Sequence, residues 1–237
     1  MKTRRELLAS LSTLWLARAA LATEAVSPGT VGQRLERFDA LSRALARHQL
    51  SQVDWQRGVE EAAHGIDLAE LCRRADFDRL VKRLPLLPKG TSAERVDLLP
   101  HAAFTPKIFC MGRGRAIIPH GHDNMVSHHL VLSGTLRGQH WERLRDEPSF
   151  LVARPTIDRV FGPGDSSSIS DQRDNIHWFV TTSARAYTLD CIVDNLDPSR
   201  GHRFAIDFVD PDRASPQPDG TVRLPRLELD EALGRYG

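Results

Sequence analysis

Short β-prone runs from Phe104 onward limit the fold of this chain more than any other feature. Clusters of Gly, Pro, Asp and Asn separate the runs, as expected of a small antiparallel barrel or sandwich. The runs cover residues 107–110, 116–118, 128–132, 150–153, 176–181 and 187–193. We therefore expect a mainly β domain over residues 104–209, followed by a C-terminal loop and short helix over residues 210–237.

The preceding segment, residues 31–90, has the periodicity of helices. Apolar residues recur there at spacings of three and four between charged ones: Leu35, Phe38, Leu41 and Leu45. The same spacing predicts a second helix over residues 54–63 and a third over residues 67–83. Pro85 and Pro88 then end the helical pattern. We expect these helices to pack on the β domain.

The first 22 residues are typical of an export signal. A charged start is followed by an apolar stretch over residues 7–17 and by Ala20-Leu21-Ala22, a small-x-small cleavage pattern. The pair Arg4-Arg5 resembles a twin-arginine signal. The sequence thus predicts a periplasmic protein. A cytoplasmic protein with an amphipathic N-terminal helix is the alternative, favoured by Glu6 and Arg18. No later run approaches the ~20 apolar residues of a membrane helix, so we expect no membrane contact after signal removal.

Charge and cysteine content limit the partners. Lys and Arg number 32 and Asp and Glu 31, a net charge of +1, which argues against nucleic acid as a partner. The cysteines Cys72, Cys110 and Cys191 are expected to be buried apolar residues. An odd number at wide spacing predicts no disulfide framework. A single bridge from Cys191 to Cys72 or Cys110 would be compatible with export.

Three histidines are the candidate metal ligands. His120 and His122 are two residues apart in a β-prone run, so both imidazoles point to the same side of a strand and can reach one point inside a barrel. Imidazole suits Fe, Cu, Ni, Mn and Zn. His177 lies among apolar residues of another run, where an unpaired ring would be costly. The alternatives are a surface pair for the first two and a hydrogen-bonded core residue for His177.

The residues around these histidines resemble the two cupin motifs. Gly114 and Gly134 flank the His-x-His pair at the spacing of the first motif, and Ser127 replaces its Glu. The turn Gly162-Pro163-Gly164-Asp165 resembles the one that precedes the second motif, which would contain His177. The resemblance implies a cupin-type antiparallel β-barrel (a jelly roll) with the N-terminal helices packed on it. The departure at Ser127 argues against a four-ligand metal site with a carboxylate.

The chain further resembles the cysteamine dioxygenase and plant cysteine oxidase family. The similar segments are Ile108-Phe109-Cys110, residues 116–122, Met125, Leu132-Ser133-Gly134, residues 175–179 and Leu189-Asp190. That resemblance implies an iron(II) enzyme in which His120, His122 and His177 hold the metal. It would oxidise a small thiol or an exposed cysteine to a sulfinate with O₂. Asp190 would orient the substrate or act beside the metal.

Two further histidines depart from that family. By strand parity His129 shares a face with Ser127. We therefore expect its side chain to point into the pocket and to contact the substrate or a metal-binding residue. His128 should face the other way and be structural. A Tyr that follows the Leu-Asp pair in the plant enzymes is absent, which leaves the substrate open.

Three readings of the function share the triad. They are an iron thiol dioxygenase, a cupin enzyme of another reaction type with Mn, Ni or Zn, and a non-catalytic cupin that binds a ligand. A pocket lined by Arg137, His140 or Arg143 would favour an anionic substrate. Barrels of this kind often pair through their sheet edges, so a homodimer is a further expectation.

Overall fold

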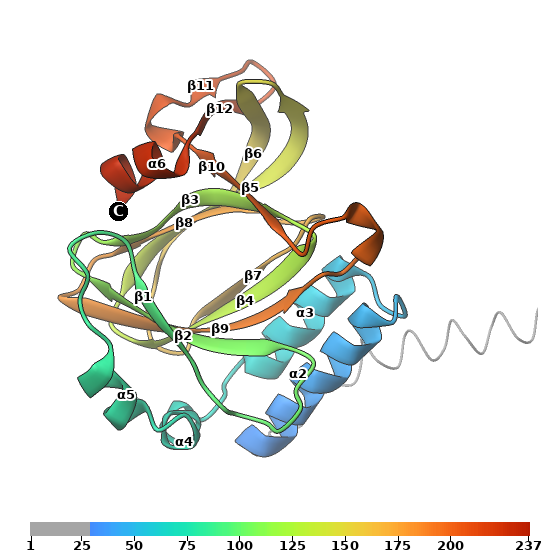
Figure 1. The fold of residues 1–237 in the computed structure, drawn as a ribbon, viewed down its shortest axis with the longest axis vertical. Helices are drawn as coiled ribbons and strands as arrows, with labels where there is room; N and C mark the ends of the chain where they lie inside the picture. The colour runs from blue at the N-terminus through green and yellow to red at the C-terminus, as the bar shows by residue number, and fades with distance from the viewer. Residues whose placement is uncertain (1–28) are drawn as a thin grey trace, which may run out of the picture.

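The computed structural model describes residues 29–237, so the predicted export signal lies outside the described residues. In this part of the chain two antiparallel sheets face each other, with helices on the outer side of one of them (Figure 1). No helix within residues 29–237 combines the length and the apolar character needed to cross a bilayer.

The strands are β1 (Ser92–Arg95), β2 (Thr105–Gly112), β3 (Ala116–Asp123), β4 (Met125–Ser133), β5 (Leu136–Glu147), β6 (Phe150–Phe161), β7 (Ser166–Ile169), β8 (Ile176–Thr181), β9 (Arg185–Asp194), β10 (Ala205–Val209), β11 (Ser215–Pro216) and β12 (Val222–Leu227). The helices are α2 (Val31–Ala46), α3 (Gln52–Ala63), α4 (Leu68–Arg74), α5 (Phe77–Arg83) and α6 (Leu229–Tyr236), with short 3₁₀ turns at Pro198–Arg200 and Pro211–Arg213.

Eight of the strands form one long hairpin that is rolled into a barrel. Strand β5 pairs with β6, and outward from that bend β4 pairs with β7, β3 with β8 and β2 with β9, all antiparallel. Rolling adds the pairs β4–β9 and β5–β8, which produces the sheet orders β2-β9-β4-β7 and β3-β8-β5-β6. This is the strand order of a jelly roll. The predicted fold class is therefore confirmed.

Six strands of the described chain, the two-residue β11 among them, were not predicted from the runs, because their sequences do not alternate in the usual way. Strand β5 carries charged residues along its second half, where it and β6 extend beyond the barrel. Strand β7 is rich in serine. Strands β1, β10 and β12 lie at or beside sheet edges, and β12 pairs with β6 in the segment expected to hold only a loop and a helix. The expected C-terminal helix is present as α6.

Helices α2 to α5 cover the outer face of the five-stranded sheet (Figure 1). Thr30 is the N-cap of helix α2, and its hydroxyl accepts from the backbone amide of Gln33 in a capping box. Ser51 is the N-cap of α3, and its hydroxyl also accepts a backbone hydrogen bond. The apolar stripe predicted for the first helix, Leu35 to Leu45, is buried in the core between helices and sheet. The predicted third helix is wrong as one element. Asp76, with φ of 48°, separates α4 from α5.

Alternate residues of β4 point to opposite sides of this sheet. Val126, Leu130 and Leu132 belong to the core under the helices, whereas Ser127 and His129 line the barrel interior. His128 lies on the helix side, as the parity argument predicts, and its ring centroid is 5.2 Å from that of Phe38. Neither of its ring nitrogens has a hydrogen-bond partner among the described residues.

His128 predicts a pH dependence of stability. Burial, with a smaller effect from His129, lowers the pKa of His128 from 6.5 to about 3. Between pH ~6.5 and pH ~3 the imidazole of His128 is thus protonated in the unfolded chain and neutral in the folded protein. The free energy of unfolding therefore falls as the pH falls through this window. Between pH 7 and pH 5 the loss from this group is about 2 kcal/mol.

We expect His128→Leu to make the free energy of unfolding less dependent on pH by about that amount. Urea unfolding of the variant and the wild type at pH 7 and pH 5 measures the difference. His64→Leu, which replaces an exposed histidine, is the matched control and should retain the wild-type dependence. Equal pH dependence in all three proteins would show that His128 contributes nothing.

Candidate metal centre and cavity

Strands β3 and β8 bring the three predicted ligands together. His120 and His177 are direct partners in the antiparallel register, and His122 lies two residues farther along the same face of β3. One ring nitrogen from each histidine lies within 4.8 Å of the other two. The ring centroid of His120 lies 4.4 Å from that of His122 and 4.3 Å from that of His177. The triad could therefore hold a metal ion.

Hydrogen bonds fix the ring of His120 and the backbone of His122. The Nδ1 of His120 lies 2.6 Å from the carbonyl oxygen of Ile118, so the ring donates from Nδ1 and leaves Nε2 as the metal-binding atom. Asn175 donates from Nδ2 to the carbonyl of His122 at 2.7 Å and to that of Ser170 at 2.9 Å. It thereby joins β3 to the segment that enters β8.

Gly121 makes the approach of Asn175 feasible. A Cβ atom at this position would lie 2.7 Å from the Asn175 Oδ1 and 3.2 Å from the Ile176 Cγ1. The nearest neighbour of Gly121 is thus a side chain. It belongs to the residue that holds His122 in place.

Burial keeps the three imidazoles neutral. It lowers the pKa of His120 to about 4, and it lowers the pKa values of His122 and His177 far below 6.5, with a smaller contribution from neighbouring histidines. The Nδ1 atoms of His122 and His177 have no hydrogen-bond partner among residues 29–237. Neutral imidazoles with converging nitrogens in a buried site are the donor set that divalent transition metals prefer. The residues present therefore fit a metal.

A histidine–aspartate pair lies across from the triad. His129 on β4 and Asp190 on β9 are register partners, and the His129 Nδ1 lies 2.7 Å from the Asp190 Oδ2. Both side chains are buried, and the His129 ring centroid is 5.1 Å from that of His177. The carboxylate accepts from Nδ1, so Nε2 is the nitrogen left without a partner in the described part of the chain. The structure thus brings both predicted catalytic residues to the metal site.

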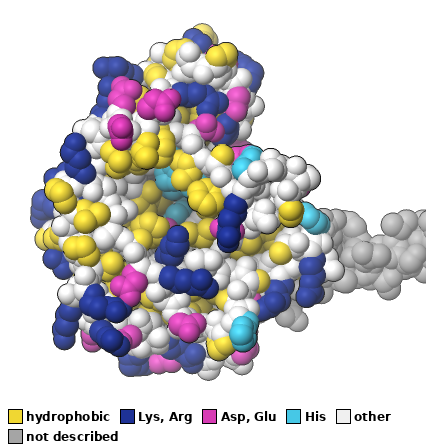
Figure 2. Space-filling view, viewed as in Figure 1, with side chains coloured by type: hydrophobic (Ala, Val, Ile, Leu, Met, Phe, Trp, Pro, Cys, Tyr) yellow, Lys and Arg dark blue, Asp and Glu magenta, His cyan; other side chains and the backbone are white. Residues whose placement is uncertain are grey.

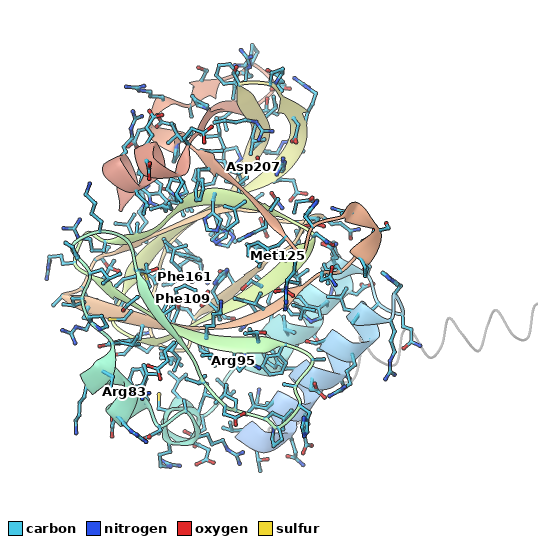
Figure 3. The ribbon with its side chains drawn as sticks, viewed as in Figure 1. Arg83, Arg95, Phe109, Met125, Phe161 and Asp207 are labelled. Atoms are coloured by element: carbon cyan, nitrogen blue, oxygen red, sulfur yellow. The ribbon has the colours of Figure 1, made fainter. Side chains whose placement is uncertain are left out.

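A cavity of about 490 Å³ connects this centre to the surface. Figure 2 shows the hollow in the middle of the molecule, with histidine inside and hydrophobic side chains around it. Figure 3 places Phe109 and Met125 in the opening between the sheets. The remaining walls are mostly apolar, with Ala116, Ile117, Ile118, Ile192, Phe204, Ile206, Phe208 and Leu233.

The two arginines named as candidate lining residues, Arg137 and Arg143, are not in the cavity wall. Arg137 pairs with Asp158, and Arg143 pairs with Asp146 and Asp207 outside the cavity. The cations in the wall are Lys89 and Lys107, which the sequence reasoning missed. The alternation of β2, with Ile108 and Cys110 facing the helices, is the signal that could have placed Lys107 inside.

His140, a candidate lining residue, is a neighbour of the centre but not part of the cavity wall. It lies directly opposite His177 in the β5–β8 register, fully buried, with ring centroids 6.1 Å apart. Both its nitrogens lack partners within the described residues, and it does not line the cavity. Register between β5 and β8 could not be read from the sequence, because β5 itself was not predicted. The three cysteines are free and lie outside the cavity wall.

Comparison with known proteins yields only distant structural likenesses. No family model matches the chain, and no curated protein matches it. Procruciferin, an 11S globulin from Brassica napus, matches 52% of this chain with 28% of its own length (12% identity, TM-score 0.36). Oxalate oxidase in complex with glycolate matches 52% of this chain with 56% of its own (19% identity, TM-score 0.36). A protein with a double-stranded β-helix domain from Klebsiella pneumoniae subsp. pneumoniae matches 54% of this chain with 92% of its own length (12% identity, TM-score 0.37). The fold assignment above depends on the strand order.

Metal content tests the centre directly. We expect about one divalent metal ion per chain after anaerobic purification, and a loss of affinity of about a hundredfold or more in His122→Ala, because one of three ligands is removed. Elemental analysis by mass spectrometry gives the stoichiometry. His128→Leu, which alters a histidine on the other side of β4, should retain the metal. A wild-type protein without metal, or equal metal in His122→Ala, would rule out the triad as the site.

Proposed function

We propose that this protein is an iron(II)-dependent thiol dioxygenase that converts a thiol into a sulfinate. The observation that carries the proposal is a site with three neutral histidines, no carboxylate ligand, and a histidine–aspartate pair across the cavity. The resemblance of residues 108–190 to the cysteamine dioxygenase and plant cysteine oxidase family supports the same activity. In the reaction both atoms of O₂ are transferred to sulfur, so R–SH and O₂ yield R–SO₂H.

His120, His122 and His177 would hold the iron, each through one ring nitrogen. Bound there, Fe(II) would supply a positive charge that favours the thiolate form of the substrate and the electrons that activate O₂. Ser127 stands where a carboxylate ligand would be in other cupins, and its hydroxyl oxygen has no partner among the described residues. The hydroxyl is too weak a ligand to replace a carboxylate, so substrate and O₂ would retain the open side.

His129 is the residue that would handle the substrate proton. Its Nε2 lacks a partner, and its Nδ1 is held by Asp190, which fixes both the tautomer and the direction of the ring. Nε2 is therefore placed to accept the thiol proton as the substrate binds and to return it to solvent through the cavity. Asp190 acts through His129 and is a positioning residue.

The apolar walls have a role of their own. Phe109, Ile117, Ile192 and Phe208 surround the open side of the triad. They exclude water from the reacting sulfur, which strengthens electrostatic interactions there and protects intermediates from side reactions.

Oxygen uptake with cysteamine, cysteine and a peptide that begins with Cys tests the proposal. We expect thiol-dependent O₂ consumption by the iron-loaded protein and its loss in His177→Ala. In Asp190→Asn we expect kcat to fall about a hundredfold with the iron still bound, because His129 loses its orientation. His128→Leu serves as the control and should retain wild-type uptake.

Bound metal without any thiol-dependent uptake would contradict the proposal. It would leave the two other readings, a cupin enzyme of another reaction type with Mn, Ni or Zn, or a ligand-binding cupin. Asp190→Asn protein with unchanged kcat would instead remove Asp190 and His129 from the mechanism, without affecting the assignment of the triad.

A further inference from the structure

The mouth of the cavity carries positive charges that have no protein partner. Lys107 on β2 is the register partner of Asp190, so its side chain leaves the sheet on the cavity face, and it is half-buried there. Arg95 on β1 is in turn the register partner of Lys107 and lies on the same face. Lys89, from the loop after α5, completes the group. Figure 3 shows Arg95 at the lower side of the opening, where Figure 2 shows Lys and Arg side chains along the rim of the hollow.

None of these three cations forms an ion pair or hydrogen bond within residues 29–237, although most arginines of the described chain do. The adjacent Glu94, which points to the other side of β1, pairs with Arg83. Each carboxylate in the cavity wall is engaged through one oxygen. Asp190 accepts from His129, and Asp194 accepts from the Arg203 Nε at 2.8 Å. The other oxygen of Asp190 has no hydrogen-bond partner within the described residues, but it is buried, so the free charges that a ligand meets at the mouth are positive.

The distance from Lys107 to His129, which lies across from the triad, suits a short substrate. Lys107 on β2 is separated from His129 on β4 by one strand, β9, which corresponds to about 10 Å between backbones. The lysine side chain covers part of this span, and a two-carbon chain between thiol and anion would cover the rest. The wall between the two ends is apolar, with Phe109 and Ile192, which suits methylene groups.

We propose that the substrate is a mercapto acid, a small thiol that carries a carboxylate. The inference that the substrate has a thiol rests on the proposed dioxygenase function. The inference that it has a carboxylate rests on the cations alone. The carboxylate is bound by Lys107 in a charge-assisted hydrogen bond, and Lys89 and Arg95 add to the positive field at the mouth. A thiol with an ammonium group in the same place meets repulsion from all three.

Three thiols with the same two-carbon spacer and different end groups test the effect of charge: 3-mercaptopropionate, 2-mercaptoethanol and cysteamine. Calorimetric titration under anaerobic conditions, with the metal-free and the iron-loaded protein, measures their affinities without turnover. We expect 3-mercaptopropionate to bind about tenfold or more tightly than cysteamine, with the neutral thiol between them. The preference should shrink as the salt concentration rises, because the mouth is open to solvent.

Lys107→Gln should remove most of this preference, and Lys107→Glu should reverse it. Lys82→Gln, which replaces an exposed lysine on α5 away from the cavity, is the matched control and should retain it. If Lys107→Glu fails to fold, Lys107→Gln and the double variant Lys89→Gln/Lys107→Gln carry the same test. Circular dichroism establishes the folding of each variant.

The outcomes separate this inference from the proposed function. Equal binding of the three thiols by the wild type, or tighter binding of cysteamine, overturns the inference even if O₂ uptake is found. An unchanged preference in Lys107→Gln overturns the role of Lys107. A preference for 3-mercaptopropionate that Lys107→Glu reverses supports the inference, even if no thiol leads to O₂ uptake and the dioxygenase proposal fails.

Discussion

The register between β3 and β8 is the constraint on which the rest of the site depends. Because the side-chain period of a strand is two, a slip of one residue would turn every interior side chain to the outside. A register shift between Ile117 and His120 brings His120 opposite His177, while Ile117 pairs with Phe179. The rolled hairpin fixes this pairing from its bend at β5 and β6 outward. Barrel closure and ligand geometry are therefore set by the same backbone hydrogen bonds.

The buried polar groups of the barrel interior oppose folding. Unpaired nitrogens of His122, His177, His129 and His140 lie where most side chains are apolar, and each costs free energy unless something binds it. The opposite face of the five-stranded sheet bears an extensive apolar core with four helices, Trp55 and Phe38 among its members. We interpret the helical layer as the source of stability that lets the interior be polar. Stability and chemistry thus occupy opposite faces of one sheet.

Strand parity explains how much of the site could be predicted. His120, His122, His129 and the outward direction of His128 follow from alternation within single strands, and the jelly roll follows from the order of the runs together with the motif resemblance. The cavity position of Lys107 also follows from alternation, within β2, although it was not predicted. His140 could not be placed, because its position depends on pairing between strands far apart in the chain. The division of the third helix at Asp76 was missed because the apolar spacing continues across it, while only the backbone angle changes.

The two walls of the cavity come from different sheets. The triad lies on β3 and β8 of the seven-stranded sheet, whereas His129, Asp190 and Lys107 lie on β4, β9 and β2 of the five-stranded sheet. The residues proposed for metal binding and those proposed for substrate recognition therefore lie on two different sheets that face each other across the cavity. A change on one sheet can alter substrate charge or proton transfer while the ligand nitrogens stay where β3 and β8 place them. This separation explains why a histidine triad alone cannot specify a reaction. In this chain the residues proposed to determine the substrate and the proton transfer belong to the five-stranded sheet.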